Sequence, residues 1–189
     1  MKFTISRFKS VKSTNEEAIK LIKKNKIKPT IITALEQTKG KGTMGKKWVS
    51  KKGNLFVSIF FQISLYKIKF QEFSVLNAKI LRRILNKYSK FELKIKWPND
   101  ILIKQKKLSG ILQEIITHKK KKYLIIGIGI NTVSAPNSKK FKAISLASCS
   151  RTKVANQLIL KDIKKTYESL LMDIKNNKFS VFKKNIYKG

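Results

Sequence analysis

The segment Gly40–Lys47 combines residue types that can bind a phosphate. It reads Gly-Lys-Gly-Thr-Met-Gly-Lys-Lys, and glycines at this spacing before a lysine are what a Walker A loop uses. In that motif a Ser or Thr follows the lysine and a helix comes next, whereas here Lys47 stands in the Ser/Thr place and Trp48-Val49-Ser50 leads to an apolar strand. A true P-loop is therefore disfavoured. Two interpretations stay open: a flexible surface loop, or a loop whose N–H groups and lysines close over an anion.

Three other segments each allow a structural and a functional interpretation. Ser13-Thr14-Asn15 by itself is more typical of a helix cap, and Pro98-Asn99-Asp100 is more typical of a turn. Gly127-Ile128-Gly129-Ile130-Asn131 suggests a dinucleotide-binding loop, but no third glycine follows and the segment ends a predicted strand rather than opening a helix. Taken singly, none of the three identifies a function.

The order of these segments along the chain is more informative than any one of them. The series runs Ser13-Thr14-Asn15, Gln37, Gly40–Trp48, Lys96-Trp97-Pro98-Asn99-Asp100, Lys107-Leu108-Ser109-Gly110-Ile111-Leu112 and Gly127–Asn131. From about Phe8 to Lys188 it resembles the catalytic domain of biotin protein ligases. The most specific part is Lys-Trp-Pro-Asn-Asp followed seven residues later by Lys-x-x-Gly-Ile-Leu. The resemblance implies the fold of biotinyl and lipoyl ligases, which is related to class II aminoacyl-tRNA synthetases and has a mixed sheet as the floor of the site.

The resemblance also implies an activity and a role for each matching residue. The activity is the ATP-dependent conversion of biotin to biotinyl-5′-AMP with release of pyrophosphate, and then transfer of biotin to a lysine of a biotin carboxyl carrier protein. The implied biotin-binding residues are Ser13, Thr14, Asn15, Gln37, Gly40, Lys41, Gly42, Thr43, Lys107 and Gly110. The implied nucleotide-binding residues are Lys41, Trp48, Asn99, Asp100 and Asn131. Asp100 is also expected beside the Mg²⁺ ion that accompanies ATP.

Lys107 is the residue on which the predicted chemistry depends most. A carboxylate that attacks the α-phosphate brings two anions together, and a fixed ammonium group offsets their repulsion. Lys107 is therefore expected to hold the biotin carboxylate in line with the phosphorus atom, and then to polarise the acyl-adenylate carbonyl when the carrier lysine attacks. Mg²⁺ would neutralise the leaving pyrophosphate. No covalent enzyme intermediate is needed.

The chain departs from the family pattern in the glycine-rich loop and at its ends. The family loop usually reads Gly-Arg-Gly-Arg-x-Gly-Arg, whereas Lys41, Thr43 and Lys46 stand at the arginine positions here, so Thr43 removes one positive charge. Many relatives continue into a small SH3-like domain, and some begin with a DNA-binding domain. The 189 residues are expected to form a single catalytic domain over 1–189 without either addition, and a repressor role is not expected.

Hydrophobic periodicity predicts the elements that position these residues. Strands are expected at 2–8, 30–36, 54–61, 93–97, 101–104, 107–116 and 122–130, and helices at 13–24, 70–88 and 153–174. Ser13 and Glu16 have the spacing of a capping box. The residues of the last helix expected to face inward are Leu158, Ile163, Tyr167, Leu170 and Leu171. Because strands cluster mid-chain with few crossover helices, a mixed sheet with flanking helices (α+β) is favoured over a doubly wound fold.

The charge composition allows two kinds of partner. The chain has 44 Lys+Arg against 10 Asp+Glu, a formal net charge of +34, and such a value ordinarily suggests nucleic acid. The lysines are scattered, however, and accompany no helix-turn-helix, RNP or zinc-finger pattern. They are interpreted mainly as solvated faces, with an acidic carrier domain as the functional alternative. A lipoate or octanoyl ligase of the same fold and a basic nucleic-acid-binding module are the competing functions, and the Trp-Pro-Asn-Asp and Lys-x-x-Gly-Ile-Leu motifs argue against both.

Nothing in the sequence indicates export, a membrane span or a metal cluster. The N-terminus lacks the apolar run of a signal peptide, and the longest apolar stretches, around 55–61 and 123–130, are too short to span a bilayer. Cys149 is the only cysteine, so an intrachain disulfide is excluded, and no Cys/His cluster is present. A cytoplasmic protein, monomeric or homodimeric, without specific nucleic-acid or membrane partners is expected.

Overall fold

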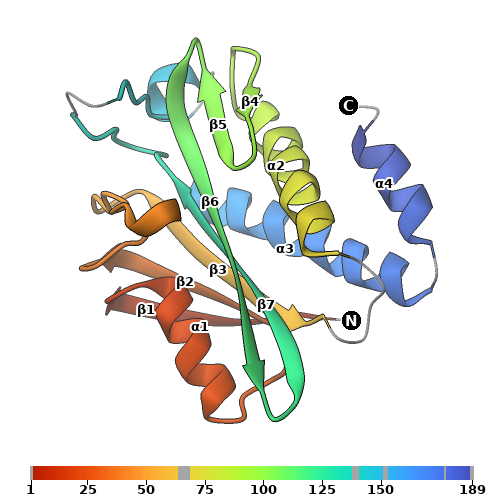
Figure 1. Cartoon of the computed structure of the whole chain (residues 1–189). Helices are drawn as coiled ribbons and strands as arrows, with labels where there is room; N and C mark the ends of the chain where they lie inside the picture. Colours follow the sequence, from red (N-terminus) through yellow and green to blue (C-terminus); the bar gives the residue numbers. More distant parts are fainter. Residues whose placement is uncertain (1, 64–68, 138–140, 151–152, 177, 188–189) are drawn as a thin grey trace.

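A mixed seven-stranded sheet forms the centre of the computed structural model, which describes residues 2–63, 69–137, 141–150, 153–176 and 178–187. Its strands are β1 (Thr4–Val11), β2 (Thr30–Gln37), β3 (Leu55–Gln62), β4 (Lys94–Lys96), β5 (Asp100–Ile103), β6 (Lys106–His118) and β7 (Lys121–Ile130). Their spatial order is β1-β2-β3-β7-β6-β5-β4. β1 and β2 pair in parallel, and the remaining neighbours pair antiparallel (Figure 1). The predicted α+β class is confirmed.

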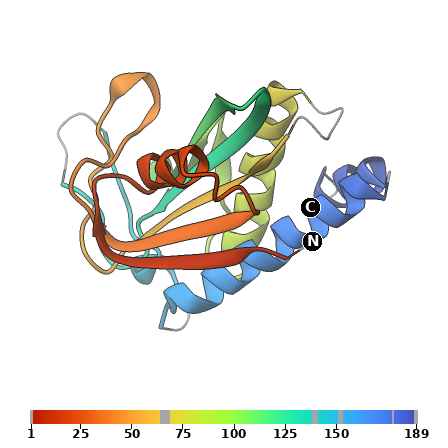
Figure 2. The same cartoon turned by 90° about the horizontal axis from the view of Figure 1, so that it is seen from below.

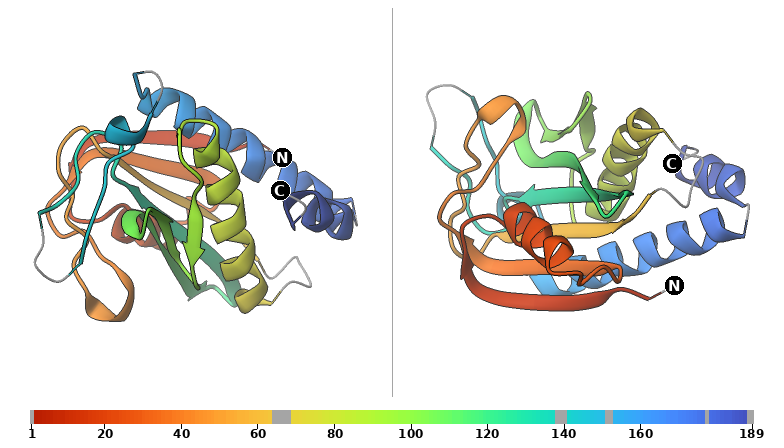
Figure 3. Two further views of the ribbon diagram at one scale, coloured as in Figure 1. Left: turned by 90° about the horizontal axis from the view of Figure 1, so that it is seen from above. Right: turned by 60° about the horizontal axis from the view of Figure 1, so that its bottom comes forward.

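Helices cover the two faces of the sheet unequally. α1 (Thr14–Lys23) lies on one face, and α2 (Phe70–Asn86) and α3 (Asn156–Lys175) lie on the other, with α4 (Phe179–Tyr187) packed against α2 and α3 (Figures 1 and 2). Two short 3-10 helices, Thr43–Gly45 and Ala147–Cys149, lie in the loops. Figure 3 shows that these loops gather at one end of the sheet, opposite the two chain termini.

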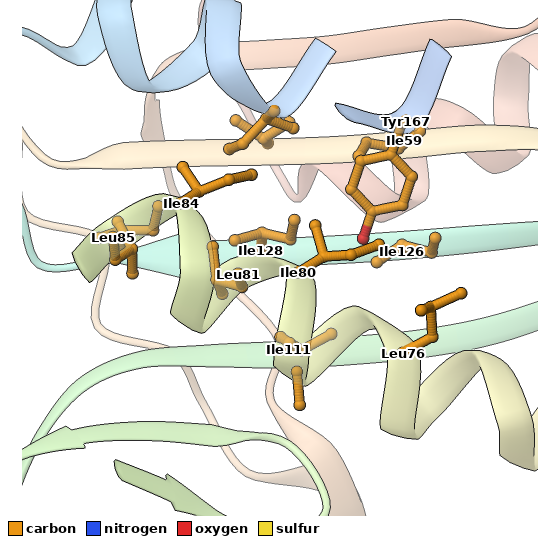
Figure 4. Packing of buried hydrophobic residues seen from close by; sticks show 14 of the residues in the cluster. Ile59, Leu76, Ile80, Leu81, Ile84, Leu85, Ile111, Ile126, Ile128 and Tyr167 are labelled. Atoms are coloured by element: carbon orange, nitrogen blue, oxygen red, sulfur yellow. The ribbon is translucent and has the colours of Figure 1, made fainter. Parts of the chain in front are cut away.

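Alternation along each strand separates the two apolar clusters of the core. Val57, Ile59 and Phe61 of β3 belong to the large cluster under α2 and α3, whereas Phe60 packs in the smaller cluster under α1. Figure 4 shows isoleucines and leucines of α2 lying against Ile126 and Ile128 of β7 in the large cluster. The large cluster therefore packs on the face of the sheet that α2 and α3 cover, and the smaller cluster packs on the face that α1 covers.

Two expectations about side-chain positions in helices are wrong. Leu158 is 54% exposed, because α3 begins only at Asn156 and its buried stripe starts one residue later, at Ile159. Ser13 is the N-cap of α1, but its side chain makes no capping hydrogen bond. Glu16 forms an ion pair with Lys41 instead, so the capping box does not form.

Helix α4 is an element that the sequence analysis did not predict. It is 9 residues long, and only Phe182 and Ile186 in it are buried, too few positions for a helical period to stand out. Its apolar face becomes evident only where it packs against α2 and α3.

A chain of hydrogen bonds crosses the apolar core beneath α2. The Tyr167 hydroxyl donates to Asn77 Oδ1 at 2.8 Å, and Asn77 Nδ2 donates to Gln113 Oε1 at 2.7 Å. Gln113 Nε2 donates in turn to the Phe70 carbonyl at 2.8 Å. Burial raises the pKa of the Tyr167 phenol, so its hydroxyl keeps the proton that this arrangement needs.

Tyr167→Phe removes the hydroxyl donor and keeps the buried ring. Because Asn77 Oδ1 then loses this partner inside the core, we expect the free energy of unfolding to fall by about 1–3 kcal/mol, as measured by urea denaturation. Tyr187→Phe is the matched control, since Tyr187 is 37% exposed, and its change should stay within about 0.5 kcal/mol. Equal stability of Tyr167→Phe and wild type would show that this hydrogen bond adds no net stability.

Candidate functional site

A pocket opens on the α1 face of the sheet, at the end where the loops gather. It holds about 440 Å³ of empty space, a figure that includes the open mouth. Eleven of the fourteen predicted site residues line it: Ser13, Thr14, Asn15, Gln37, Lys41, Gly42, Thr43, Trp48, Asn99, Lys107 and Gly110. Segments up to about a hundred residues apart in the sequence therefore meet in one cavity.

The other three predicted residues lie next to the pocket rather than on its wall. Gly40 anchors the base of the loop, where its carbonyl accepts the Trp48 N–H at 2.9 Å. Asp100 Oδ1 lies 2.8 Å from Lys107 Nζ, in an ion pair whose geometry is not that of a hydrogen bond. Asn131 is 2% exposed, and its Nδ2 donates to the Lys107 carbonyl at 3.3 Å. Asn131 thus holds the main chain of Lys107 in place through a hydrogen bond and does not face the pocket.

A β-bulge aims Lys107 into the pocket. The pairing of β5 with β6 shifts by one residue and leaves Leu108 as the extra residue. In a regular strand Lys107 would share the buried face of Ile111, but the bulge turns it to the face of Gly110 and sends Leu108 into the core. The predicted motif Lys-x-x-Gly thus places the Lys107 ammonium group and the backbone of Gly110, which has no side chain, on the same wall of the pocket.

Glycines in β6 and β7 make room for the Trp48 indole. Gly110 and Gly129 are paired across the two strands, and Trp48 lies over both. A Cβ atom at Gly129 would lie 2.6 Å from Trp48 Nε1, and one at Gly110 would lie 2.9 Å from its Cζ3. Lys107 Nζ is 5.4 Å from the centre of the indole ring. The glycine pattern at the end of β7 therefore serves a close approach of side chains and not a dinucleotide loop.

The opposite half of the pocket is held by a polar cluster. Gln37 Oε1 accepts hydrogen bonds from the Thr14 N–H at 2.8 Å and from the Thr14 hydroxyl at 3.1 Å. Gln37 Nε2 donates to Ser50 Oγ at 3.0 Å, and the Ser50 hydroxyl donates to the Trp48 carbonyl at 3.3 Å. The Ser13 hydroxyl lines the pocket and has no hydrogen-bond partner among the described residues. Ser13 is thus available to a ligand, whereas Thr14 and Gln37 hold the walls together.

An ion pair fastens the glycine-rich loop to α1. Lys41 Nζ lies 2.8 Å from Glu16 Oε1. The hydrogen bond from Lys41 lowers the pKa of Glu16, and the same bond raises the pKa of Lys41, with a smaller contribution from the charge of Glu114. Both side chains therefore stay charged at neutral pH. The tip of the loop, by contrast, is open, and Met44 is 90% exposed.

Sequence reasoning missed four residues of this site: Glu16, Ser50, Ser58 and Glu114. Ser58 is fully buried under the pocket, where its Oγ lies 2.7 Å from Thr14 Oγ1. Its signal in the sequence was a single polar residue within the apolar run Leu55–Phe61. Glu16 and Glu114 are two of only ten acidic residues, and this scarcity is the signal by which the sequence could have indicated them.

No group of three or more His, Cys, Asp or Glu side chains that could hold a metal occurs within the described ranges. None of the helices in that part of the chain is long and apolar enough to cross a membrane.

Comparison with known proteins assigns this fold and pocket to a family. Residues 7–131 match the model of the biotin/lipoate A/B protein ligase family, and the chain belongs to this family. It is 30% identical over 177 residues to the bifunctional ligase/repressor BirA of Bacillus subtilis, an alignment that covers 90% of this chain and 54% of that protein. The chain spans about half the length of the curated relatives it matches.

Solved structures show the same fold. Biotin protein ligase from Aquifex aeolicus in complex with biotin and ATP superposes with a TM-score of 0.77 at 31% identity, covering 97% of this chain and 76% of that one. Biotin protein ligase from Leishmania major in complex with biotinyl-5-AMP gives a TM-score of 0.72 at 26% identity, covering 85% and 71%. The mixed sheet with its helices is therefore that of biotin protein ligases.

Proposed function

We propose that this domain is a biotin protein ligase: it activates biotin with ATP as biotinyl-5′-AMP and transfers biotin to a lysine of a biotin carboxyl carrier protein. The observation that carries the proposal is the placement of the Lys107 ammonium in a pocket between Asp100 and the Trp48 ring. The family membership and the ligands named for the Aquifex and Leishmania structures support it.

The two halves of the pocket suit the two substrates. The half around Ser13, Thr14 and Gln37 offers hydroxyl and amide groups that match the ureido ring of biotin. The half around Trp48 and Asn99 offers an aromatic face and polar groups for the nucleotide. Gly127, under Asn15, and Gly129, under Trp48, are two residues apart on β7, a rise of about 7 Å along the strand. The two substrates would therefore meet end to end.

Lys107 is proposed to act on both steps. Its ammonium would offset the repulsion when the biotin carboxylate attacks the α-phosphate, and would then stabilise negative charge on the acyl oxygen when the carrier lysine attacks. In the structure Lys107 forms an ion pair with Asp100. When the substrates bind, contacts with them would replace part of this ion pair.

Asp100 is proposed to meet a magnesium ion that arrives with ATP. Such ions are held by one or two protein carboxylates, phosphate oxygens and water, and a single carboxylate beside the phosphate half of the pocket fits this need. When bound, the ion would neutralise phosphate charge. Asp100 would hold it and keep Lys107 oriented.

Biotin-dependent exchange of labelled pyrophosphate into ATP tests the proposed function. We expect exchange that requires biotin and is not supported by lipoate or octanoate. A second incubation, with labelled biotin, ATP and a biotin carrier domain, tests the transfer step. Exchange with lipoate but not with biotin would assign the chain to the lipoate ligases of the same family, and tighter binding to duplex nucleic acid than to the carrier would favour a nucleic-acid-binding function.

Thr43→Arg should slow the escape of biotinyl-adenylate. Thr43 lines the pocket where the family usually has arginine, and a guanidinium can make fixed, charge-assisted hydrogen bonds that a threonine cannot. One such bond corresponds to roughly ten- to a hundredfold slower release. Rapid filtration of wild type and Thr43→Arg preloaded with labelled biotin and ATP measures the rate. Equal release rates would mean that other residues keep the loop closed.

A further inference from the structure

Exposed lysines gather at the end of the sheet that is remote from the pocket. The turn that follows α1 and the turn that joins β6 to β7 lie next to each other there (Figure 1). His118 Nε2 lies 3.0 Å from Asn25 Oδ1, in a hydrogen bond that connects the two turns. The exposed lysines of the two turns, which we call the lysine cluster, are Lys23, Lys24, Lys26, Lys28, Lys119, Lys120, Lys121 and Lys122. Two segments far apart in the sequence thus form one charged surface.

The charge of the lysine cluster is not neutralised by neighbouring carboxylates. The ion pairs in the part of the chain that the structure describes all use other lysines, and neither turn contains an acidic residue. Lys23 and Lys24 lie at the carboxyl end of α1, where the helix dipole favours cations. The other members of the cluster have no such stabilisation. Their charges therefore repel one another, and a bound polyanion would relieve this repulsion.

The turn between β6 and β7 contains residues that its backbone does not favour. Lys119 and Lys120 have φ angles of 47° and 61°, and a two-residue hairpin turn in which both φ angles are positive is of type I′. Asn-Gly is a preferred pair in this turn, because left-handed backbone crowds the Cβ atom of most other residues. The sequence thus places two positive charges here at a cost in stability. Backbone strain of this kind is concentrated at functional sites.

The turn after α1 has a fixed backbone. Asn25, with a φ angle of 59°, ends the helix in the left-handed conformation. Its N–H donates to the Ile22 carbonyl at 2.9 Å, and the Lys26 N–H donates to the Leu21 carbonyl at 2.9 Å, which is the pattern of a Schellman motif. Because both turns are regular and are joined by His118, the lysines of the cluster project from a defined surface.

The side chains of the two turns favour a phosphate backbone as the ligand. Lysines act as point charges that bind phosphates without reading bases, and nucleic acid presents such charges closely spaced along a line. Binding to a membrane surface would also need apolar side chains that insert. Ile27, which is 37% exposed, is the one large apolar side chain in the two turns.

The position of the lysine cluster separates it from the pocket. Gly110 on the pocket wall and His118 beside the turn lie eight residues apart on β6, a rise of about 27 Å along the strand. A nucleic acid bound at the cluster would therefore leave the mouth of the pocket open.

We propose that the lysine cluster is a sequence-independent binding surface for the phosphate backbone of nucleic acid. This activity is additional to the proposed ligase function and does not depend on it. The domain would carry out its chemistry at one end of the sheet and be held on nucleic acid at the other end.

Fluorescence anisotropy with a labelled mixed-sequence DNA duplex of about 20 base pairs tests this role as the salt concentration is varied. The whole chain should bind with a Kd of about 1–100 μM near physiological salt, and duplexes of other sequences should compete equally. Lys119→Asn/Lys120→Gly removes two charges and supplies the pair that the turn prefers. This variant should bind roughly tenfold to thirtyfold more weakly, and its slope of log Kd against log salt should be lower by about two. Its Tm should rise, because the strained lysines are gone.

Lys161→Gln/Lys165→Gln is the matched control, because it removes two exposed lysines from α3 on the other face of the sheet. It should change the Kd of the duplex less than about twofold. Equal weakening by the two double variants would show that binding follows net charge alone and would overturn the inference. Absence of duplex binding by the wild-type chain, or tighter binding to polyglutamate or phosphatidylserine vesicles at equal charge concentration, would also overturn it. Biotin-dependent pyrophosphate exchange should be unchanged in both variants, so failure of this inference leaves the proposed ligase function standing.

Discussion

Lys107→Ala should abolish adenylate formation while leaving the fold intact. The side chain lies on the pocket wall and is 26% exposed, so its removal takes a charge from the site and little volume from the core. Removing one preorganised electrostatic group from an active site typically costs about a hundred- to a thousandfold in rate. We therefore expect biotin-dependent pyrophosphate exchange to fall at least about a hundredfold.

Lys106→Ala is the matched control for this variant, because it removes an exposed lysine from the adjacent position of the same strand. It should exchange pyrophosphate at the wild-type rate. Circular dichroism and thermal unfolding of both proteins establish that they fold. Near-normal turnover by a folded Lys107→Ala protein would refute the assignment of the catalytic lysine.

Gly129→Ala should disable the nucleotide half of the pocket with a single added methyl group. The new Cβ atom would lie 2.6 Å from Trp48 Nε1, and a rigid indole cannot yield as the end of a flexible side chain can. Trp48 must therefore leave the sheet. Stacking of a base on an aromatic side chain contributes about 1–3 kcal/mol, so we expect the Kd of ATP to rise roughly tenfold or more, while the Kd of biotin changes much less.

The combination with Trp48→Ala separates this mechanism from damage to the sheet. Once the indole is gone, the methyl group at residue 129 has nothing to displace, so Gly129→Ala should cost no additional ATP affinity in that background. Titration calorimetry of the two single variants and the double variant completes the cycle. Additive losses would indicate that the methyl group disturbs β7 itself.

Most of the fold could be predicted from periodicity, and the exceptions have physical causes. The strand Leu55–Gln62 is almost entirely apolar, and the helix Phe70–Asn86 has a clear helical stripe, so both appear as expected. Helix α4 was missed because only two of its residues are buried, which is too few to show a helical period in the sequence. Its apolar face is evident only from its packing against α2 and α3. Leu158 was misplaced because periodicity alone does not say at which residue a buried stripe begins.

The site was predicted best where residues are grouped in the sequence. The loop and the Lys-x-x-Gly motif were found because their members are neighbours in the chain. Ser58 and Glu114 were missed because each is an isolated polar residue, and their connection runs through Asn15 across two other elements. Asn131 was predicted to bind the nucleotide, and that role stays a prediction. Its Nδ2 donates to the Lys107 carbonyl, a position that depends on how β7 ends beside the bulge.

The pairing at the centre of the sheet has a consequence for the order of folding. β3 pairs with β7 in a register that joins Gln62 to Tyr123 and Leu55 to Ile130, so the 60 residues between Gln62 and Tyr123 must form a loop before these strands meet. Closing such a loop costs conformational entropy, and this cost is offset only after the contacts between the two strands have formed. Long-range pairings of this kind therefore form slowly. Ser58 and Gly127 face each other in this pairing. The floor of the pocket is thus assembled only when β7 joins the sheet, and a nascent chain cannot hold substrate before that event.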